Sequence, residues 1–290
     1  MEKIQIKRYG DKETMELREK GPLKYLVFPE IEKLGIVDHM FSTRLGGVSK
    51  GAYSEMNLSY TRGDDKEAVD ENYRRIADAM GHGRSLEDFV LTFQTHTTNV
   101  MVVKEEDRGK GPFKARDYTD IDGLITNIPG IILGTFHADC PPIYFIDPVK
   151  SAIGLSHSGW KGTRGKIASV TIEKMKQNYG TDPGDLICAI GPSICGDCYE
   201  IGGDVAEQFG SAFTEKELKD EKILVPYPND KYRLHLWNAI RLTLVQSGVP
   251  KENIIVTDIC TRCNPELLFS HRVHGENRGN LCAFLSLKQK

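Results

Sequence analysis

The residue types best suited to chemistry gather in the stretch FHADCPPIYFIDPVKSAIGLSHSGWKGTRGK, residues 136–166. It contains Cys140 and His157, which follow or end apolar runs, and His96 ends another such run, FVLTFQTH. Two imidazoles and one thiolate form a ligand set that zinc accepts in tetrahedral geometry, with the fourth position left for water or substrate. The sequence therefore predicts a metal site made by His96, Cys140 and His157, with zinc as the metal and copper as the alternative.

Two neighbours of these ligands carry groups that move protons. Asp139 and His137 lie beside Cys140, so either is a candidate for a partner that orients a ligand or for a proton shuttle. We therefore predict a catalytic set of His137, Asp139 and Cys140. A metal-free alternative stays open, in which Cys140 is a nucleophile and His157 its base.

A glycine-rich loop follows His157 and is rich in basic residues. Backbone N–H groups at such a loop, before a helix, favour an anion, and Lys161 and Arg164 add positive charge. The loop matches neither the P-loop nor the dinucleotide-binding pattern. We predict that Lys161 and Arg164, together with Arg44 and Asn57 of the segment FSTRLGGVSKGAYSEMNLS, bind substrate or phosphate. Further positions that could complete a pocket, although each alone is as well explained as structural, are Tyr199, Glu200 and residues 270–272.

Two C-x-x-C pairs, Cys195–Cys198 and Cys260–Cys263, suggest a structural zinc site. About sixty residues separate them, however, whereas paired zinc-binding motifs are usually about 15–20 residues apart. The spacing therefore favours packing near the pocket over a shared metal, and no role is assigned to the pairs.

The elements that must position these residues are mostly short strands. Runs rich in β-branched and aromatic residues, punctuated by Gly, Pro and Asp, predict strands at residues 3–6, 24–28, 38–43, 89–96, 100–103, 123–126, 131–138, 142–147, 151–158, 185–190 and 253–259. Apolar periodicity before a glycine predicts helices at 68–81, 167–180 and 234–248. Since strands outnumber helices without alternating with them, we predict an α/β (α+β) fold of mixed β-sheets in a layered sandwich with outer helices. We predict one domain over 1–290, with 1–25 as a peripheral hairpin.

The composition excludes several classes of protein. A net charge of −3 and a pI near 6.3 give no electrostatic reason to expect nucleic acid as partner. The N-terminus lacks the apolar segment of a signal peptide, and no apolar run is long enough to span a membrane. We expect a cytoplasmic protein with reduced cysteines, monomeric or a weak homodimer, whose partners are small molecules.

The ordered motifs FSTRLGGVS, QTH, DGLIT, HADCPP, HSGWKGT, IGPSIC–CYEIG and DICTRCNPELLFSHR resemble the laccase-domain family of YlmD- and YfiH-type proteins, also called multicopper polyphenol oxidoreductases, and its Bacillus branch most of all. The resemblance covers residues 37–282. It implies a fold similar to the catalytic domain of cytotoxic necrotizing factors and a zinc held by His96, Cys140 and His157. It also implies purine nucleoside phosphorylase activity on adenosine, inosine and methylthioadenosine, with adenosine deaminase activity. One branch is linked to hydrolysis of a peptidoglycan precursor, which a Cys–His or metallo-amidohydrolase could perform.

The copper-dependent oxidase label can be weighed against the residues. Multicopper oxidation relies on several His-x-His pairs, and this chain has eight histidines with no such pair. One site of two histidines and a cysteine could hold a blue copper, which transfers electrons without reducing oxygen. Nucleoside and phosphate are therefore the preferred substrates, and polyphenol oxidation is the alternative.

Overall fold

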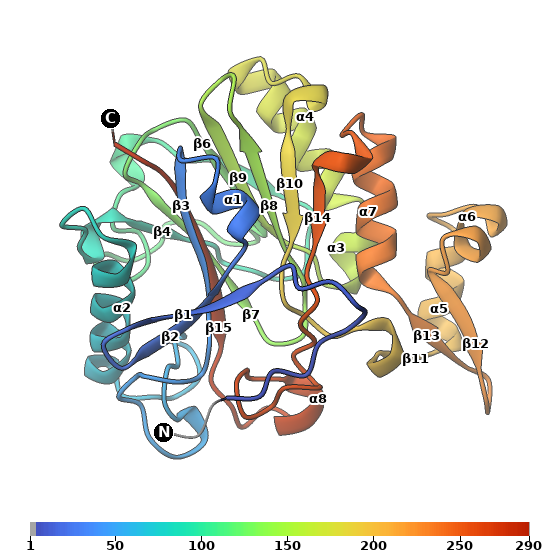
Figure 1. The fold of residues 1–290 in the computed structure, drawn as a ribbon, viewed down its shortest axis with the longest axis horizontal. Helices are drawn as coiled ribbons and strands as arrows, with labels where there is room; N and C mark the ends of the chain where they lie inside the picture. The colour runs from blue at the N-terminus through green and yellow to red at the C-terminus, as the bar shows by residue number, and fades with distance from the viewer. Residues whose placement is uncertain (1–3, 290) are drawn as a thin grey trace.

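Two six-stranded sheets lie face to face and form the body of the protein (Figure 1). The structure is a computed structural model that describes residues 4–289. In the first sheet only the β4–β7 pair is parallel. Its strands, in spatial order, are β1 (Glu16–Lys20), β2 (Leu23–Val27), β3 (Val37–Ser42), β15 (Leu281–Leu287), β7 (Ile132–His137) and β4 (Phe89–Leu91).

The second sheet is mixed as well, with parallel pairs at its two edges and antiparallel pairs between them. Its strands, in spatial order, are β14 (Ile254–Val256), β10 (Ile187–Ile190), β8 (Pro142–Asp147), β9 (Ala152–His157), β6 (Gly123–Thr126) and β5 (Val100–Val102).

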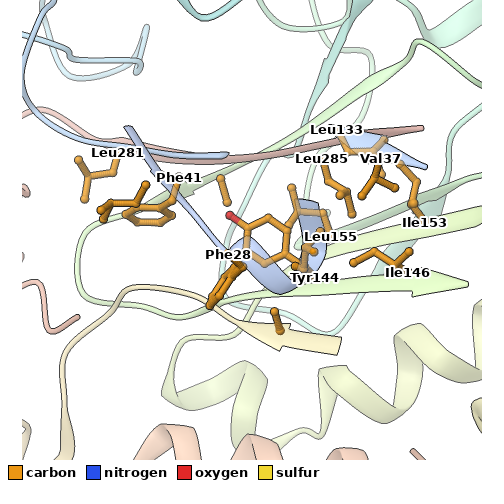
Figure 2. Close-up of a cluster of buried hydrophobic side chains, with 14 of the residues drawn as sticks. Phe28, Val37, Phe41, Leu133, Tyr144, Ile146, Ile153, Leu155, Leu281 and Leu285 are labelled. Carbon is orange, nitrogen blue, oxygen red and sulfur yellow. The ribbon is translucent and has the colours of Figure 1, made fainter. Parts of the chain in front are cut away.

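The main hydrophobic core fills the space between the two sheets. Phe41 and Leu285 of the first sheet pack with Tyr144 and Leu155 of the second, and all four are completely buried (Figure 2). Each such side chain stabilises the fold by about 1.5–3 kcal/mol through burial alone. This core fixes the separation of the sheets, and with it the positions of the loops that cross from one sheet to the other.

Helices cover the two outer faces. Helix α2 (Lys66–Met80) packs on the first sheet, and α4 (Ile167–Tyr179) and α7 (Leu236–Gln246) pack on the second. The three predicted helices are confirmed, and α2 and α4 end at Gly81 and Gly180, both with positive φ. Among residues 4–289, no helix combines the length and the apolar character that a membrane crossing requires.

A third, smaller sheet stands out from the body beside α7 (Figure 1). It contains β11 (Glu200–Gly202), β13 (Lys231–Leu234) and β12 (Leu224–Tyr227), in that order, and packs with its own core against α5 (Gly203–Gly210). The remaining helices are α6 (Glu215–Asp220), α1 (Pro29–Glu32), α3 (Trp160–Arg164), α8 (His271–His274) and the 3-10 helices at Gly51–Tyr53, Leu86–Asp88, Glu105–Asp107, Pro183–Asp185, Gly196–Cys198 and Lys251–Asn253.

The expected fold class, mixed sheets with a few helices, is confirmed, whereas the likeness to the toxin domain stays a prediction. The prediction of a strand at residues 3–6 is wrong for residues 4–6, which form no strand, and residue 3 lies outside the described residues. Strand β15 was not predicted, although its seven residues are all buried in the middle of the first sheet. A continuous apolar run is ambiguous between strand and helix. Strands β1 and β2 form an antiparallel hairpin at the edge of the first sheet, joined to it by pairing of β2 with β3, whereas the peripheral hairpin was predicted at 1–25.

The two C-x-x-C pairs lie together, although their spacing along the chain argued against a shared site. Strands β10 and β14 are parallel neighbours, and the turns after them carry Cys195–Cys198 and Cys260–Cys263. The four sulfur atoms are within 4.8 Å of one another. Sequence distance misled here because the intervening chain leaves the body as the third sheet and returns through α7 to the next strand.

Candidate metal centre and active site

The predicted metal ligands meet at one end of the sandwich, where the chain twice crosses between the sheets. The loop from β4 to β5 carries His96, and the turn from β7 to β8 carries Cys140. His157 is the last residue of β9, beside the start of β8. The three segments therefore come from both sheets, and the core that holds the sheets together also holds the ligands.

The ligand atoms of His96, Cys140 and His157 all lie within 4.8 Å of one another. The two rings meet edge to face with their centroids 5.0 Å apart. Gly159 lies against the group: a Cβ atom there would be 2.9 Å from the Cys140 sulfur and 3.0 Å from the His96 Cδ2 atom. Only glycine leaves these ligands room to converge.

Asp122, immediately before β6, is the buried carboxylate that orients two of the ligands. Its Oδ1 accepts hydrogen bonds from Nδ1 of His157 at 2.8 Å and from the backbone N–H of His96 at 3.1 Å. Its Oδ2 accepts from the backbone N–H groups of Thr95 and Thr97 and from the Thr97 hydroxyl. The bond to Nδ1 leaves Nε2 of His157 free to bind a metal, the arrangement common among metal-binding histidines. Sequence reasoning missed Asp122, because an aspartate before glycine reads as a turn.

The backbone at His96 has a φ of 65°, in the left-handed region that residues with a Cβ seldom adopt. The hydrogen bond from its N–H to Asp122 helps hold it there. Asp139, beside Cys140, has a φ of 87°. Such strain persists only where the surroundings hold it, and it concentrates at functional sites.

The electrostatics of the group favour a thiolate. Burial opposes ionisation of the Cys140 thiol, but His157 and His96 outweigh it and lower its pKa to about 6. Burial also opposes protonation of His157, yet Cys140 and the hydrogen bond to Asp122 raise its pKa to about 9. Before any cation binds, a thiolate therefore faces an imidazolium, and a metal would displace the imidazolium proton.

The two predicted proton carriers have different surroundings. Both ring nitrogens of the buried His137 are occupied, by the Thr135 hydroxyl at 2.7 Å and the Cys140 carbonyl at 2.9 Å. Burial lowers the pKa of His137 well below its usual range, so the ring is neutral and braces the turn. The Asp139 carboxylate accepts from the Thr261 hydroxyl at 2.6 Å and the Arg272 N–H at 2.7 Å. Asp139 therefore does not orient the histidine ligands, and Asp122 does.

The four predicted phosphate-binding residues lie away from the ligand group. The Arg44 guanidinium donates to the carbonyls of Ser54 and Pro265, and Asn57 is completely buried in loop hydrogen bonds. Lys161 is exposed above the Trp160 ring, and Arg164 donates to Gln208. None of the four lines either cavity at that group, so their role in binding phosphate stays a prediction.

Two cavities meet at the candidate ligands His96 and Cys140. One, of about 340 Å³, is lined by His96, Cys140 and His157 together with the aromatic residues Tyr60, Phe93 and Phe136. The other, of about 370 Å³, is lined by His96, Cys140, Asp139, Trp160 and Tyr199. Both volumes suit a small metabolite.

The cationic side chains at the cavities are arginines that the sequence analysis did not assign to phosphate. Arg62 and Arg278 line both cavities, Arg116 lines the first and Arg272 the second. Arg278 is only 5% exposed, and no group among the described residues accepts from its Nε. Burial lowers its pKa to about 10, so it remains a cation at neutral pH. Its Nη1 donates to the Gly279 carbonyl and the Asn280 side chain, so the rest of the guanidinium is a candidate donor to an anion in the cavities.

The donor set fits the metal that the resemblance implies. Two imidazoles, one of them oriented by a carboxylate, and one thiolate of low pKa are ligands that zinc and copper both accept. The remaining side of the group faces the cavities, so a bound ion would be open to substrate.

The whole chain was compared with known proteins. Residues 38–288 match the family described as multi-copper polyphenol oxidoreductase laccase. The chain belongs to this laccase-domain family. It is 34% identical over 253 residues to the purine nucleoside phosphorylase YlmD of Bacillus subtilis, covering 86% of this chain and 88% of that protein. It is 36% identical over 264 residues to the adenosine deaminase RL5 of an unknown prokaryotic organism, covering 86% and 96%.

A solved member of the laccase-domain family supports the architecture. The crystal structure of the hypothetical protein YfiH of Bacillus licheniformis superposes with a TM-score of 0.86 at 32% identity, covering 94% of this chain and 99% of that one. The predicted family membership and its YlmD/YfiH branch are thereby confirmed. The family's copper label finds little support in the side chains, because within residues 4–289 only one group that could hold a metal contains histidines.

Proposed function

We propose that the protein is a zinc-dependent purine nucleoside phosphorylase that also deaminates adenosine. The observation that carries this proposal is the position of His96, Cys140 and His157 between two cavities, both lined by the buried cation Arg278. Phosphorolysis needs such an arrangement, because a nucleoside and an anion must meet at one point. The relatives named as a nucleoside phosphorylase and an adenosine deaminase support it.

The first cavity is proposed to hold the nucleoside. Phe93, which stacks with Arg116 at 4.8 Å, and Phe136 offer apolar surface to a purine. Inosine, adenosine and methylthioadenosine share that ring system, and they are the proposed substrates. Aromatic faces bind purines with little demand on ring substituents, which suits a site that accepts several nucleosides.

The second cavity is proposed to admit phosphate. Arg272 and Arg278 approach it from the C-terminal segment, and Arg62 approaches it from the loop before α2. Charge-assisted hydrogen bonds from arginine are strong and directional, so they would hold phosphate against the ribose. No nucleic acid or membrane is needed as a partner.

Three residues are proposed to hold the metal, and two act beside it. His96, Cys140 and His157 are the proposed ligands, and a bound zinc would supply Lewis acidity next to the substrate. Asp139, which lines the second cavity, is proposed to accept and return protons. His137 holds the Cys140 carbonyl and so positions the thiolate.

The test is a product assay on the purified protein. With inosine and phosphate we expect hypoxanthine and ribose 1-phosphate in equal amounts, and with adenosine alone we expect inosine. Cys140→Ala should abolish both reactions. Absence of both products from zinc-loaded protein, or undiminished turnover by Cys140→Ala, would refute the proposal.

One observation favours a second candidate, a cysteine amidohydrolase that acts on a peptidoglycan precursor. Cys140, His157 and Asp122 have the contacts of a nucleophile, a base and an orienting acid, with the thiol pKa near 6. Treatment with a chelator distinguishes the candidates. A thiol hydrolase keeps its activity without metal and loses it to iodoacetamide, whereas the phosphorylase loses activity to the chelator and regains it with zinc.

A further inference from the structure

Four cysteines outside the active site converge at the carboxyl ends of two neighbouring strands. Parallel pairing of β10 with β14 continues past both strands as a bridge between Ser193 and Cys260. The bridge places Cys195 beside Cys260, and the two-residue spacing within each pair brings Cys198 and Cys263 to the same point. All four sulfur atoms lie within 4.8 Å of one another.

The spacing suits one tetrahedral ion. With metal–sulfur bonds of about 2.3 Å, tetrahedral geometry separates the sulfur atoms by about 3.8 Å. The sulfur atoms of Cys198 and Cys263 are 3.5 Å apart, and the N–H of Cys195 donates to the Cys260 sulfur at 3.3 Å. In a [2Fe–2S] or [4Fe–4S] cluster the four thiolates are spread over two or four irons, so not all of their sulfur atoms can lie this close together. Four thiolates around one ion are typical of structural zinc.

The turn that carries the first pair is shaped for this approach. Cys195 and Cys198 flank Gly196, where a Cβ atom would lie only 2.0 Å from Nδ1 of His235. Cys195 and Cys260 are each 1% exposed, whereas Cys263 is half-buried at the rim. Such a closed, four-ligand group has no open position for substrate, which separates its role from that of the active site.

We propose that Cys195, Cys198, Cys260 and Cys263 bind one structural zinc ion. The ion joins the two ends of the segment between Cys198 and Cys260, which contains the third sheet and α7. It thereby fixes that segment to the body of the protein. It also supports the active-site turn. Ile194, next to Cys195, donates its N–H to the Asp139 carbonyl at 2.9 Å, and Thr261, next to Cys260, donates its hydroxyl to the Asp139 carboxylate.

Metal analysis of the full chain, purified without added metal, tests this proposal. The variant Cys140→Ala removes the active-site thiolate, so any zinc that it retains must bind elsewhere. We expect one equivalent of zinc in Cys140→Ala and none in Cys140→Ala combined with Cys263→Ser. Because Cys263 lies at the rim, the second substitution leaves the packing of the core intact. Cys140→Ala combined with Cys188→Ala, which removes a buried cysteine outside the group, is the control and should retain the ion.

Two further measurements on Cys140→Ala, which keeps all four proposed cysteine ligands, complete the test. Replacement by cobalt in Cys140→Ala should give the strong visible absorption of a tetrahedral thiolate site, and a mercurial reagent should release zinc as four thiols react. A four-thiolate site holds a single ion, and a content below roughly 0.2 equivalents is the background of such analyses. Zinc below that content in Cys140→Ala would overturn the proposal. Iron in place of zinc, or a mass lower by four hydrogens from two disulfides, would overturn it too.

Discussion

Replacing Asp122 with Asn should weaken metal binding at the active site without removing a ligand. One oxygen of Asp122 serves His157 and His96, and the other serves Thr95 and Thr97. An asparagine supplies only one acceptor oxygen, so its NH₂ group must face donors on one side. If it faces the two threonines, two backbone N–H groups lose their acceptor, at about 1–3 kcal/mol each.

If the NH₂ group faces His157 instead, only the His96 N–H loses its acceptor, at about 1–3 kcal/mol. Nδ1 of His157 must then accept from the NH₂ group, so the ring is neutral and its only proton lies on Nε2. The second orientation costs less and should prevail in the metal-free protein. A metal at Nε2 would have to displace this proton without the carboxylate that stabilises a proton on Nδ1 in the unsubstituted protein. Loss of an orienting partner typically lowers metal affinity about 10–100-fold, which is about 1.4–2.8 kcal/mol. Unfolding of the metal-free variant should require about 1–3 kcal/mol less free energy.

Competition with a chromophoric chelator measures the affinity, and urea unfolding measures the stability. Asp120→Asn is the matched control, because Asp120 lies in the same segment and its carboxylate accepts from the exposed Thr95 hydroxyl. Cys140→Ala reports metal bound elsewhere on the chain. If Asp122→Asn bound metal as tightly as the unsubstituted protein, the carboxylate would have no orienting role and the reasoning would fail.

Further predictions concern the ligand group and the proposed anion site. Gly159→Ala should lower active-site metal affinity at least about tenfold, because its Cβ would displace the Cys140 sulfur. The control Gly210→Ala, whose Cβ would have no atom within 4 Å, should have no effect. Equal metal affinities of Gly159→Ala and the unsubstituted protein in a chelator titration would contradict the prediction. In metal-free protein, the rate of Cys140 alkylation by iodoacetamide should rise between pH 5 and 7 and then level off, because the thiol pKa is near 6 and the thiolate forms above it. A midpoint near the ordinary thiol pKa of about 8.5 would contradict the prediction. Arg278→Met should raise the KM for phosphate about 10–100-fold, because a charge-assisted hydrogen bond is lost, and it should spare adenosine deamination. Arg241→Met, which removes a surface ion pair, is the control. Equal loss of phosphorolysis and deamination in Arg278→Met would argue against an anion site.

The sequence was informative where a polar residue ends an apolar run. His96, Cys140 and His157 were found in that way, and helices α2, α4 and α7 followed from periodicity and terminal glycines. Asp122 was not predicted because its role depends on five hydrogen bonds, with residues that precede it by about 25 positions or follow it by 35. No local pattern records contacts at that range.

The arginines and the cysteine pairs show the same limit. Arg62 and Arg278 lie in loops without periodicity, and they reach the cavities only because β15 returns to the centre of the first sheet. Arg44 also lies in a loop, yet it donates to backbone carbonyls. The cysteine pairs meet because β10 and β14 are neighbours, a fact of sheet order that spacing along the chain does not contain.

The two cavities have different exposed residues in their walls. Phe93, 38% exposed, lies at the rim of the first, and His271, whose side chain is 49% exposed, lies at the rim of the second. If each reactant enters past its own set of wall residues, neither has to wait for the other, and steady-state kinetics should follow a random order of addition. A single molecule with a purine at one end and an anionic group at the other could occupy both cavities and bind more tightly than either half.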